Sequence, residues 1–214
     1  NPNDRPVIDG GYHPGLMSTN ELGMKTTIPS AENGYFSLKG TKSLFSIQAE
    51  GVTLDGLVVQ NVAGRGIGIG ASNVTVRNCV TFWTFGTGII SNPSDPITGV
   101  TIENCKALFA SMMRFEPGRR SYTGCSNNRE CVSGAIKIGR NNGNTFIRGN
   151  EVAYGGGEGI NIGKYNDPPS GSPIVVEGNT IHDCNHTGIY INASTSIVMR
   201  GNISKPETIA LWES

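Results

Sequence analysis

A corner of glycine or asparagine recurs along this chain at a fixed distance from a second glycine. Each corner follows a short β-branched run, as in VTVR at residues 74–77. The distance from corner to glycine is ten residues in four places, namely 56–66, 78–88, 149–159 and 178–188. A constant register of short strands separated by Gly and Asn turns is typical of a solenoid whose coils stack on one another.

The corners align the whole chain into columns. Seven residues share the corner column: Gly10, Gly56, Asn78, Asn104, Gly149, Gly178 and Gly201. A second apolar run follows about ten residues later, at 67–69, 89–91, 136–138, 160–162, 189–191 and 209–211. Both runs alternate with the period of two that belongs to β-strands. The pattern predicts an all-β fold, a single-stranded parallel β-helix of about seven rungs with loop insertions.

Charge gives an independent check of this register. The residues immediately before the corners alternate in sign: Asp55, Arg77, Glu103, Arg148, Glu177 and Arg200. Rungs of a parallel stack lie about 4.8 Å apart, so each side chain is expected beside an opposite charge. The column after the corner reads Leu57, Cys79, Cys105, Asn150, Asn179 and Asn202. We expect an inward asparagine ladder there, with Cys79 and Cys105 favoured as stacked thiols over a strained disulfide and Cys184 as a buried filler.

Length and composition limit the classes of function. The 214 residues suit one domain, and 17 basic side chains balance 17 acidic ones. This balance argues against a nucleic-acid partner, and no apolar run is long enough for a membrane span. We expect a single domain over 1–214, a fragment or mature piece of a longer chain. Insertions are expected near 12–40, 111–132 and 165–172.

Two features favour an extracellular or cell-surface location. Cys125 and Cys131 enclose only five polar residues, which predicts a small disulfide loop. Four N-x-S/T sequons are candidate glycosylation sites, at Asn73, Asn185, Asn192 and Asn202. Asparagine also serves turns and ladders, so the sequons alone are weak evidence.

The pattern V-x-[VI]-x-[GN]-N…G-I-x-I resembles the right-handed parallel β-helix superfamily of pectate-lyase-like proteins. The resemblance covers Arg5–Glu213 and implies the right-handed form of the fold. It also implies a role among polysaccharide lyases, hydrolases, epimerases and surface adhesins. The catalytic motifs of pectin hydrolases, the main pectate lyases and alginate epimerases are missing from this sequence. Only residues 136–139 (IKIG) are loosely similar to a basic strand of alginate and chondroitin lyases.

Stacking of the rungs would gather polar residues on one outer face of the coil. We assign catalysis there to Lys137, Arg140 and Tyr190, and substrate binding to Asn161, Lys164, Glu158 and Arg114. Cations neutralise a uronate carboxylate and acidify its C5 proton, which a Lys or Tyr can then remove. The first hypothesis is therefore an acidic-polysaccharide-binding domain that acts by lyase-type β-elimination when catalytic. The opposing interpretation is that these are solvated residues outside a coil.

Other functions compete with this one. A hydrolase would need facing carboxylates, for which Glu158 and Asp183 are the weak candidates. Calcium is considered as an ion, with Asn166 and Asp167 as weak ligands. The second hypothesis is a structural or adhesive filament subunit that self-associates through its ends or through an apolar stripe of Phe146, Val175 and Val198. Trp83 and Phe85 are expected to pack internally rather than to hold a sugar.

Overall fold

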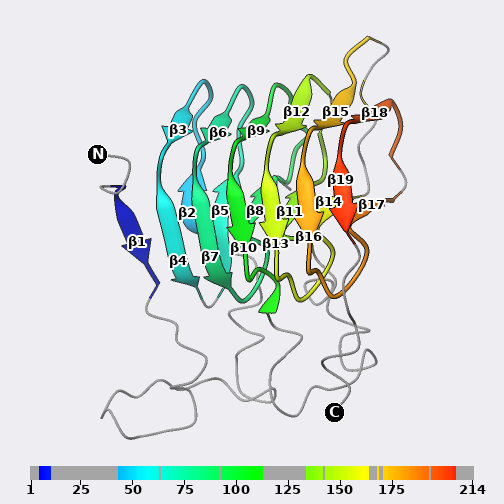
Figure 1. Ribbon diagram of the computed structural model, residues 1–214. Coiled ribbons are helices and arrows are strands. Elements are labelled where there is room, and N and C mark those ends of the chain that lie inside the picture. Colours follow the sequence, from blue (N-terminus) through cyan, green and yellow to red (C-terminus); the bar gives the residue numbers. More distant parts are fainter. Residues whose placement is uncertain are drawn as a thin grey trace, which may run out of the picture.

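The computed structural model describes a parallel β-solenoid built from three sheets (Figure 1). The described residues are 5–10, 43–62, 64–91, 93–112, 134–141, 143–163, 168, 171–192 and 194–205. The expected insertions fall almost wholly outside these ranges. Within the described residues, no helix is long and apolar enough to cross a membrane.

Each complete coil contributes one strand to every sheet. Sheet C holds β3 (Thr53–Asp55), β6 (Thr75–Arg77), β9 (Thr101–Glu103), β12 (Thr145–Arg148), β15 (Ile174–Glu177) and β18 (Ile197–Arg200). Sheet A holds β1 (Val7–Asp9), β4 (Val58–Val62), β7 (Val80–Thr84), β10 (Lys106–Leu108), β13 (Glu151–Ala153), β16 (Thr180–His182) and β19 (Ile203–Lys205). Sheet B holds β2 (Ser43–Ile47), β5 (Arg65–Ile69), β8 (Ile89–Ser91), β11 (Ile136–Ile138), β14 (Ile160–Ile162) and β17 (Ile189–Ile191).

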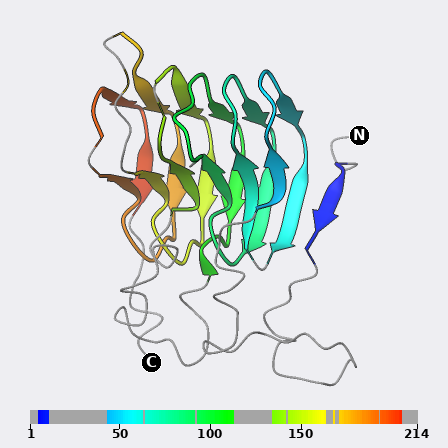
Figure 2. The ribbon, with the colours of Figure 1, turned by 180° about the vertical axis from the view of Figure 1, so that it is seen from behind.

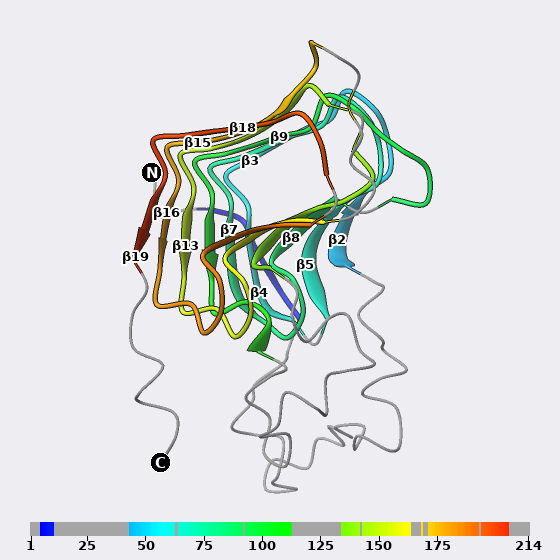
Figure 3. The same cartoon turned by 90° about the vertical axis from the view of Figure 1, so that its right-hand side faces the viewer.

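The chain runs from sheet C through the corner into sheet A and then into sheet B. The views from behind and along the stack show the three sheets as separate walls around one core (Figures 2 and 3). The parallel β-helix is confirmed, with about five turns rather than about seven rungs. Sheet A was not predicted. Its strands begin two residues after the corners, so the sequence pattern assigned their first residues to the corner itself.

The predicted register is confirmed for six of the seven corners. Gly56, Asn78, Asn104, Gly149, Gly178 and Gly201 all adopt φ between 52° and 76°. This left-handed conformation suits Gly and Asn, and it turns the chain sharply between sheets C and A. The placement of Gly10 in this column was wrong. Strand β1 pairs with β4 in sheet A, so Asp9 aligns with Gln60 rather than with Asp55. The run before Gly10 resembles sheet C only because both have short apolar strands.

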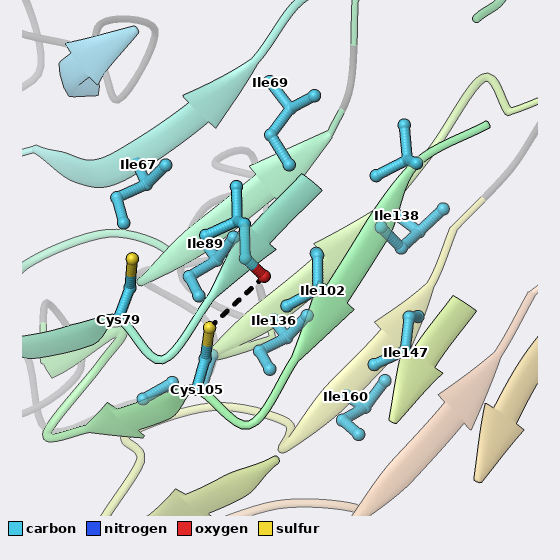
Figure 4. Packing of buried hydrophobic residues seen from close by; sticks show 14 of the residues in the cluster. Ile67, Ile69, Cys79, Ile89, Ile102, Cys105, Ile136, Ile138, Ile147 and Ile160 are labelled. Carbon is cyan, nitrogen blue, oxygen red and sulfur yellow. Dashed lines mark hydrogen bonds between the residues drawn. The ribbon is translucent and has the colours of Figure 1, made fainter. Parts of the chain in front are cut away.

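Rows of isoleucine and valine fill the interior of the coil. Ile136, Ile138, Ile160 and Ile162 are 0% exposed, and Figure 4 shows such side chains packing between the sheets. Cys79 and Cys105 are free thiols within this core, as favoured from the sequence. The Cys105 thiol donates to the Val76 carbonyl across 3.5 Å, which is the dashed contact in Figure 4. Cys184 is also free and buried, and burial raises the pKa of its thiol.

The asparagine ladder forms just inside the corners. The Asn150 amide nitrogen donates to Asn179 Oδ1 at 2.9 Å, and that of Asn179 donates to Asn202 Oδ1 at 2.8 Å. Each amide also donates to a main-chain carbonyl, from Asn150 to Ile102 and from Asn179 to Ile147. The Cys105 main-chain nitrogen donates to Asn150 Oδ1 at 2.9 Å. Buried amides thus satisfy main-chain groups that the turn leaves without ladder partners.

The alternating charges pair outside the same corners. Arg77 binds Asp55 at 2.9 Å, Arg148 binds Glu103 at 2.7 Å and Arg200 binds Glu177 at 2.6 Å. The arginines are exposed to solvent, so each pair contributes little to stability. Their main effect is on register, because a slip of one rung would place like charges side by side.

Replacement of Asn150 tests the ladder. Asn150→Ala removes one acceptor and two donor contacts inside a closed core, leaving the Cys105 N–H and the Ile102 carbonyl unsatisfied. We expect the free energy of unfolding, measured by urea titration, to fall by about 2–4 kcal/mol. Asn202→Ala at the half-buried end of the ladder is the matched control and should cost clearly less. Equal losses in the two variants would contradict a structural role for the buried ladder.

Candidate functional site

The outer face of sheet B aligns three of the polar residues selected from the sequence. Lys137 in β11 pairs with Asn161 in β14, and Asn161 pairs with Tyr190 in β17. Their strand neighbours point into the core, so these three side chains lie on the outside in consecutive rungs. Lys137 and Tyr190 are half-buried, whereas Asn161 is only 6% exposed. The face therefore combines a cation, an amide and a phenol in one column.

Glu158 joins this column from the turn before β14. It follows three consecutive glycines, residues 155–157, and its main-chain carbonyl accepts from the Ala135 nitrogen at 2.9 Å. This bond ties the turn to the neighbouring coil. Asn161 Nδ2 donates to Glu158 Oε2, while Asn161 Oδ1 has no hydrogen-bond partner. Glu158, Asn161 and Lys137 form a group that we call the sheet B triad.

Burial dominates the electrostatics of the triad. Glu158 is 3% exposed, and it is the only acidic or basic side chain among the described residues that is buried. Burial raises the pKa of Glu158 above its usual value, while the Asn161 hydrogen bond and the Lys137 charge oppose the rise. Lys137 therefore lies close enough to interact with the carboxylate. A desolvated carboxyl group beside a specific cation is the kind of perturbed group found at functional sites.

The other selected residues are placed differently. Arg140 follows β11 in the left-handed conformation, with φ of 53°, and its guanidinium donates to the Ser94 carbonyl. It is thus anchored to the loop before Ile97. Lys164, Arg114, Cys125, Cys131, Asn166 and Asp167 lie outside the described residues.

The four sequons occupy different settings. Asn73 is exposed, and Asn185 and Asn192 are half-buried. The Asn202 amide belongs to the buried ladder, where its nitrogen donates to the Val176 carbonyl at 2.8 Å. A glycan on Asn202 would need that nitrogen, so the fold already uses the atom that glycosylation would modify.

A column of aromatic rings runs along the corner after sheet A. Trp83 stacks on Phe109 and Phe109 on Tyr154, each with ring centroids 4.9 Å apart. All three adopt φ between 52° and 57°, which is unusual for bulky residues. The sequence analysis missed this column, although an aromatic residue at the equivalent position of three consecutive coils was a visible signal. Trp83 packs against other rings as expected, and Phe85 is buried at 2% exposed.

A second polar cluster lies beside these rings on sheet A. His182 Nδ1 is 2.7 Å from Asp183 Oδ2, and His182 Nε2 is 3.7 Å from Glu151 Oε1. Lys106 pairs with Glu151 at 2.7 Å. The Asp183 carboxylate is thus paired with the imidazole of His182. No group of three or more His, Cys, Asp or Glu residues in the described part of the chain is arranged to hold a metal ion.

Comparison with protein families identifies the fold independently of the coordinates. Residues 39–208 match the family model described as a right handed beta helix region. The chain belongs to the right-handed β-helix family. No curated protein and no solved structure matches it. Family membership confirms the architecture but names no substrate, because one fold supports many functions.

Replacement of Glu158 tests the electrostatics of the triad. The folded chain holds the Glu158 proton to a higher pH than the unfolded chain, because burial raises the pKa above 4.5. Stability should therefore fall as pH rises above the pKa of the unfolded carboxyl group, 4.5. Glu158→Gln keeps an acceptor for Asn161 but should remove this slope and be more stable than the wild type at neutral pH. Chemical denaturation between pH 4 and 8 measures both effects.

Glu151 provides a control of opposite sign. The Lys106 hydrogen bond lowers its pKa, so its contribution to stability is present at neutral pH and is lost on acidification. Glu151→Gln should lower stability at neutral pH and weaken its loss in acid. If Glu158→Gln behaved like Glu151→Gln, the buried carboxylate would not be the strained member of the triad.

Proposed function

We propose that the chain binds an acidic polysaccharide outside the cell, on the outer face of sheet B. The observation that carries the proposal is the sheet B triad, with its buried carboxyl group, its amide and its lysine. Asparagine, glutamate and lysine together offer hydrogen-bond acceptors and a cation within one small area. A uronate needs this combination, because it presents a carboxylate beside hydroxyl donors.

The column also matches the form of a polymer. Lys137, Asn161 and Tyr190 occupy consecutive rungs, which lie about 4.8 Å apart. A saccharide chain lying along the solenoid axis would meet these side chains in turn. The exposed arginines of sheet C pair with carboxylates of neighbouring rungs in a repeating pattern. A lysine beside a buried carboxyl group is better suited to select a ligand than a repeating surface pair.

β-Elimination is the reaction that this set would support. Lys137 would neutralise the uronate carboxylate, which acidifies the C5 proton. The phenolate oxygen of Tyr190 would accept that proton, the C5 electron pair would form the C4–C5 double bond, and the C4–O bond would break. Glu158 would hold Asn161 in place through its hydrogen bond, and a water molecule would donate a proton to the departing oxygen. The products would be an unsaturated uronate and a new reducing chain end.

Binding and elimination are tested with one pair of variants. Lys137→Ala should weaken binding to oligomers of galacturonate, mannuronate or glucuronate by roughly 10- to 100-fold, as expected for loss of a charge-assisted contact. Calorimetric titration measures binding, and ultraviolet absorbance of unsaturated products measures elimination. Lys106→Ala is the matched control, because it removes an exposed lysine from sheet A. Equal effects of the two variants, or no binding of any uronate, would defeat the proposal; binding without products would defeat only the elimination step.

One observation favours a second function, that of a self-associating structural subunit. The last described coil exposes apolar side chains from columns that are buried in the preceding coils, namely Met199 at 46% and Ile191 at 40%. The lateral stripe offers less, because Val175 is 6% exposed and Phe146 is half-buried beneath Arg148. End-to-end contact is therefore the better version of this hypothesis. Light scattering over a concentration series decides it: growth that Met199→Glu abolishes would support it, and a monomer at all concentrations would reject it.

A further inference from the structure

The carbonyl oxygen of Asn161 is a buried acceptor without a donor. Asn161 is 6% exposed, and its Oδ1 makes no hydrogen bond within the chain. A polar atom left in this state costs roughly 1–3 kcal/mol. Buried amides elsewhere in this solenoid are satisfied on both sides, as the Asn150 and Asn179 ladder shows. The unmet acceptor therefore distinguishes Asn161 from the structural asparagines.

Glu158 determines which end of the amide is presented. Asn161 Nδ2 donates to Glu158 Oε2. The reverse orientation would set the amide oxygen against a carboxylate oxygen, and two acceptors repel one another unless a proton lies between them. The ionised carboxylate thus holds the amide with its oxygen directed away. A ligand that satisfies this site must bring a hydrogen-bond donor.

Gly163 keeps the approach to this oxygen clear of a side chain. A Cβ at this position would lie 3.3 Å from Asn161 Oδ1 and 3.7 Å from Lys137 Cε. Gly163 has no left-handed φ, so the backbone itself does not require glycine there. The space next to Gly163 therefore adjoins both the unmet acceptor and the stem of the lysine. A donor and an anion on one small ligand could reach both groups together.

We infer that Asn161 is a specificity-determining residue that accepts a hydrogen bond from a free ring hydroxyl of the bound uronate. This inference rests on the proposed function, in which Lys137 holds the carboxylate of the same ligand. A hydroxyl supplies the missing donor, whereas a deoxy carbon supplies none and an O-acetyl ester presents only acceptors. The site would thus select acidic glycans whose hydroxyl at this position is unmodified.

A double-mutant cycle, in which Asn161 is changed in the protein and one hydroxyl is removed from the ligand, tests the proposed role of Asn161. The probes are uronate trisaccharides of the type that the wild-type chain binds, either intact or lacking one ring hydroxyl each. For the wild type, loss of one particular hydroxyl should weaken binding by about 10- to 100-fold. For Asn161→Ala, the same loss should change the affinity less than about 2-fold. Thr81→Val is the matched control, because it removes another buried, unpartnered oxygen, one on a strand of sheet A that points into the core, and should keep the full discrimination.

Gly163→Ala gives a second measurement that retains all three triad side chains. Its new methyl group would occupy the approach to Asn161 Oδ1, so affinity for the intact trisaccharide should fall to that of the deoxy form. Circular dichroism confirms that the variants are folded. If the wild type bound all trisaccharides equally while Lys137→Ala still lost affinity, the role of Asn161 would be wrong and the proposed function would stand. Failure of the wild type to bind any uronate would overturn the proposed function together with this inference.

Discussion

Parallel, in-register stacking is the constraint on which the rest of this structure depends. A coil cannot bury its apolar side chains alone, so each rung relies on the rungs above and below it. The asparagine ladder fixes this arrangement from inside, because Asn150 and Asn179 each bind the next rung through both side-chain and main-chain donors. The outer charge pairs of sheet C add little energy but disfavour a slipped register. Buried amides supply cohesion, and surface charges supply selectivity for one alignment.

The same stacking creates the candidate site without any motif in the sequence. Lys137, Asn161 and Tyr190 are 53 positions apart from first to last, yet pairing of β11, β14 and β17 places them in one column. A rigid stack also explains how Glu158 can be buried. The glycines at 155–157 lead the chain around the corner, and the Glu158 carbonyl is fixed to the neighbouring coil through Ala135. The free-energy cost of burying the Glu158 carboxyl group is thus offset by the stability of the rest of the stack.

Much of the architecture could be predicted because its cause is periodic. The constant interval between Gly56 and Gly66, repeated in later coils, defined sheets C and B and the column of Lys137. Sheet A was missed because its strands begin two residues after the corners, so no separate turn signal marks their start. Without a predicted sheet A, the strand before Gly10 was assigned to sheet C, although it pairs with β4. The burial of Glu158 and the unmet Asn161 oxygen could not be predicted, because both depend on the path of one turn. Periodicity determines position along the stack but not the environment of a single side chain.

The aromatic column shows why a sugar site is better placed on sheet B. Sugars and cations bind aromatic side chains through the faces of the rings. Trp83, Phe109 and Tyr154 stack face to face, so the interior of the column has its faces occupied by the neighbouring rings. His182 packs against Tyr154 in a T-shaped arrangement with ring centroids 5.7 Å apart. Ring stacking worth about 0.5–1.5 kcal/mol per pair offsets part of the strain of three left-handed bulky residues. The column thus satisfies itself, whereas the sheet B triad retains an acceptor that the chain alone does not satisfy.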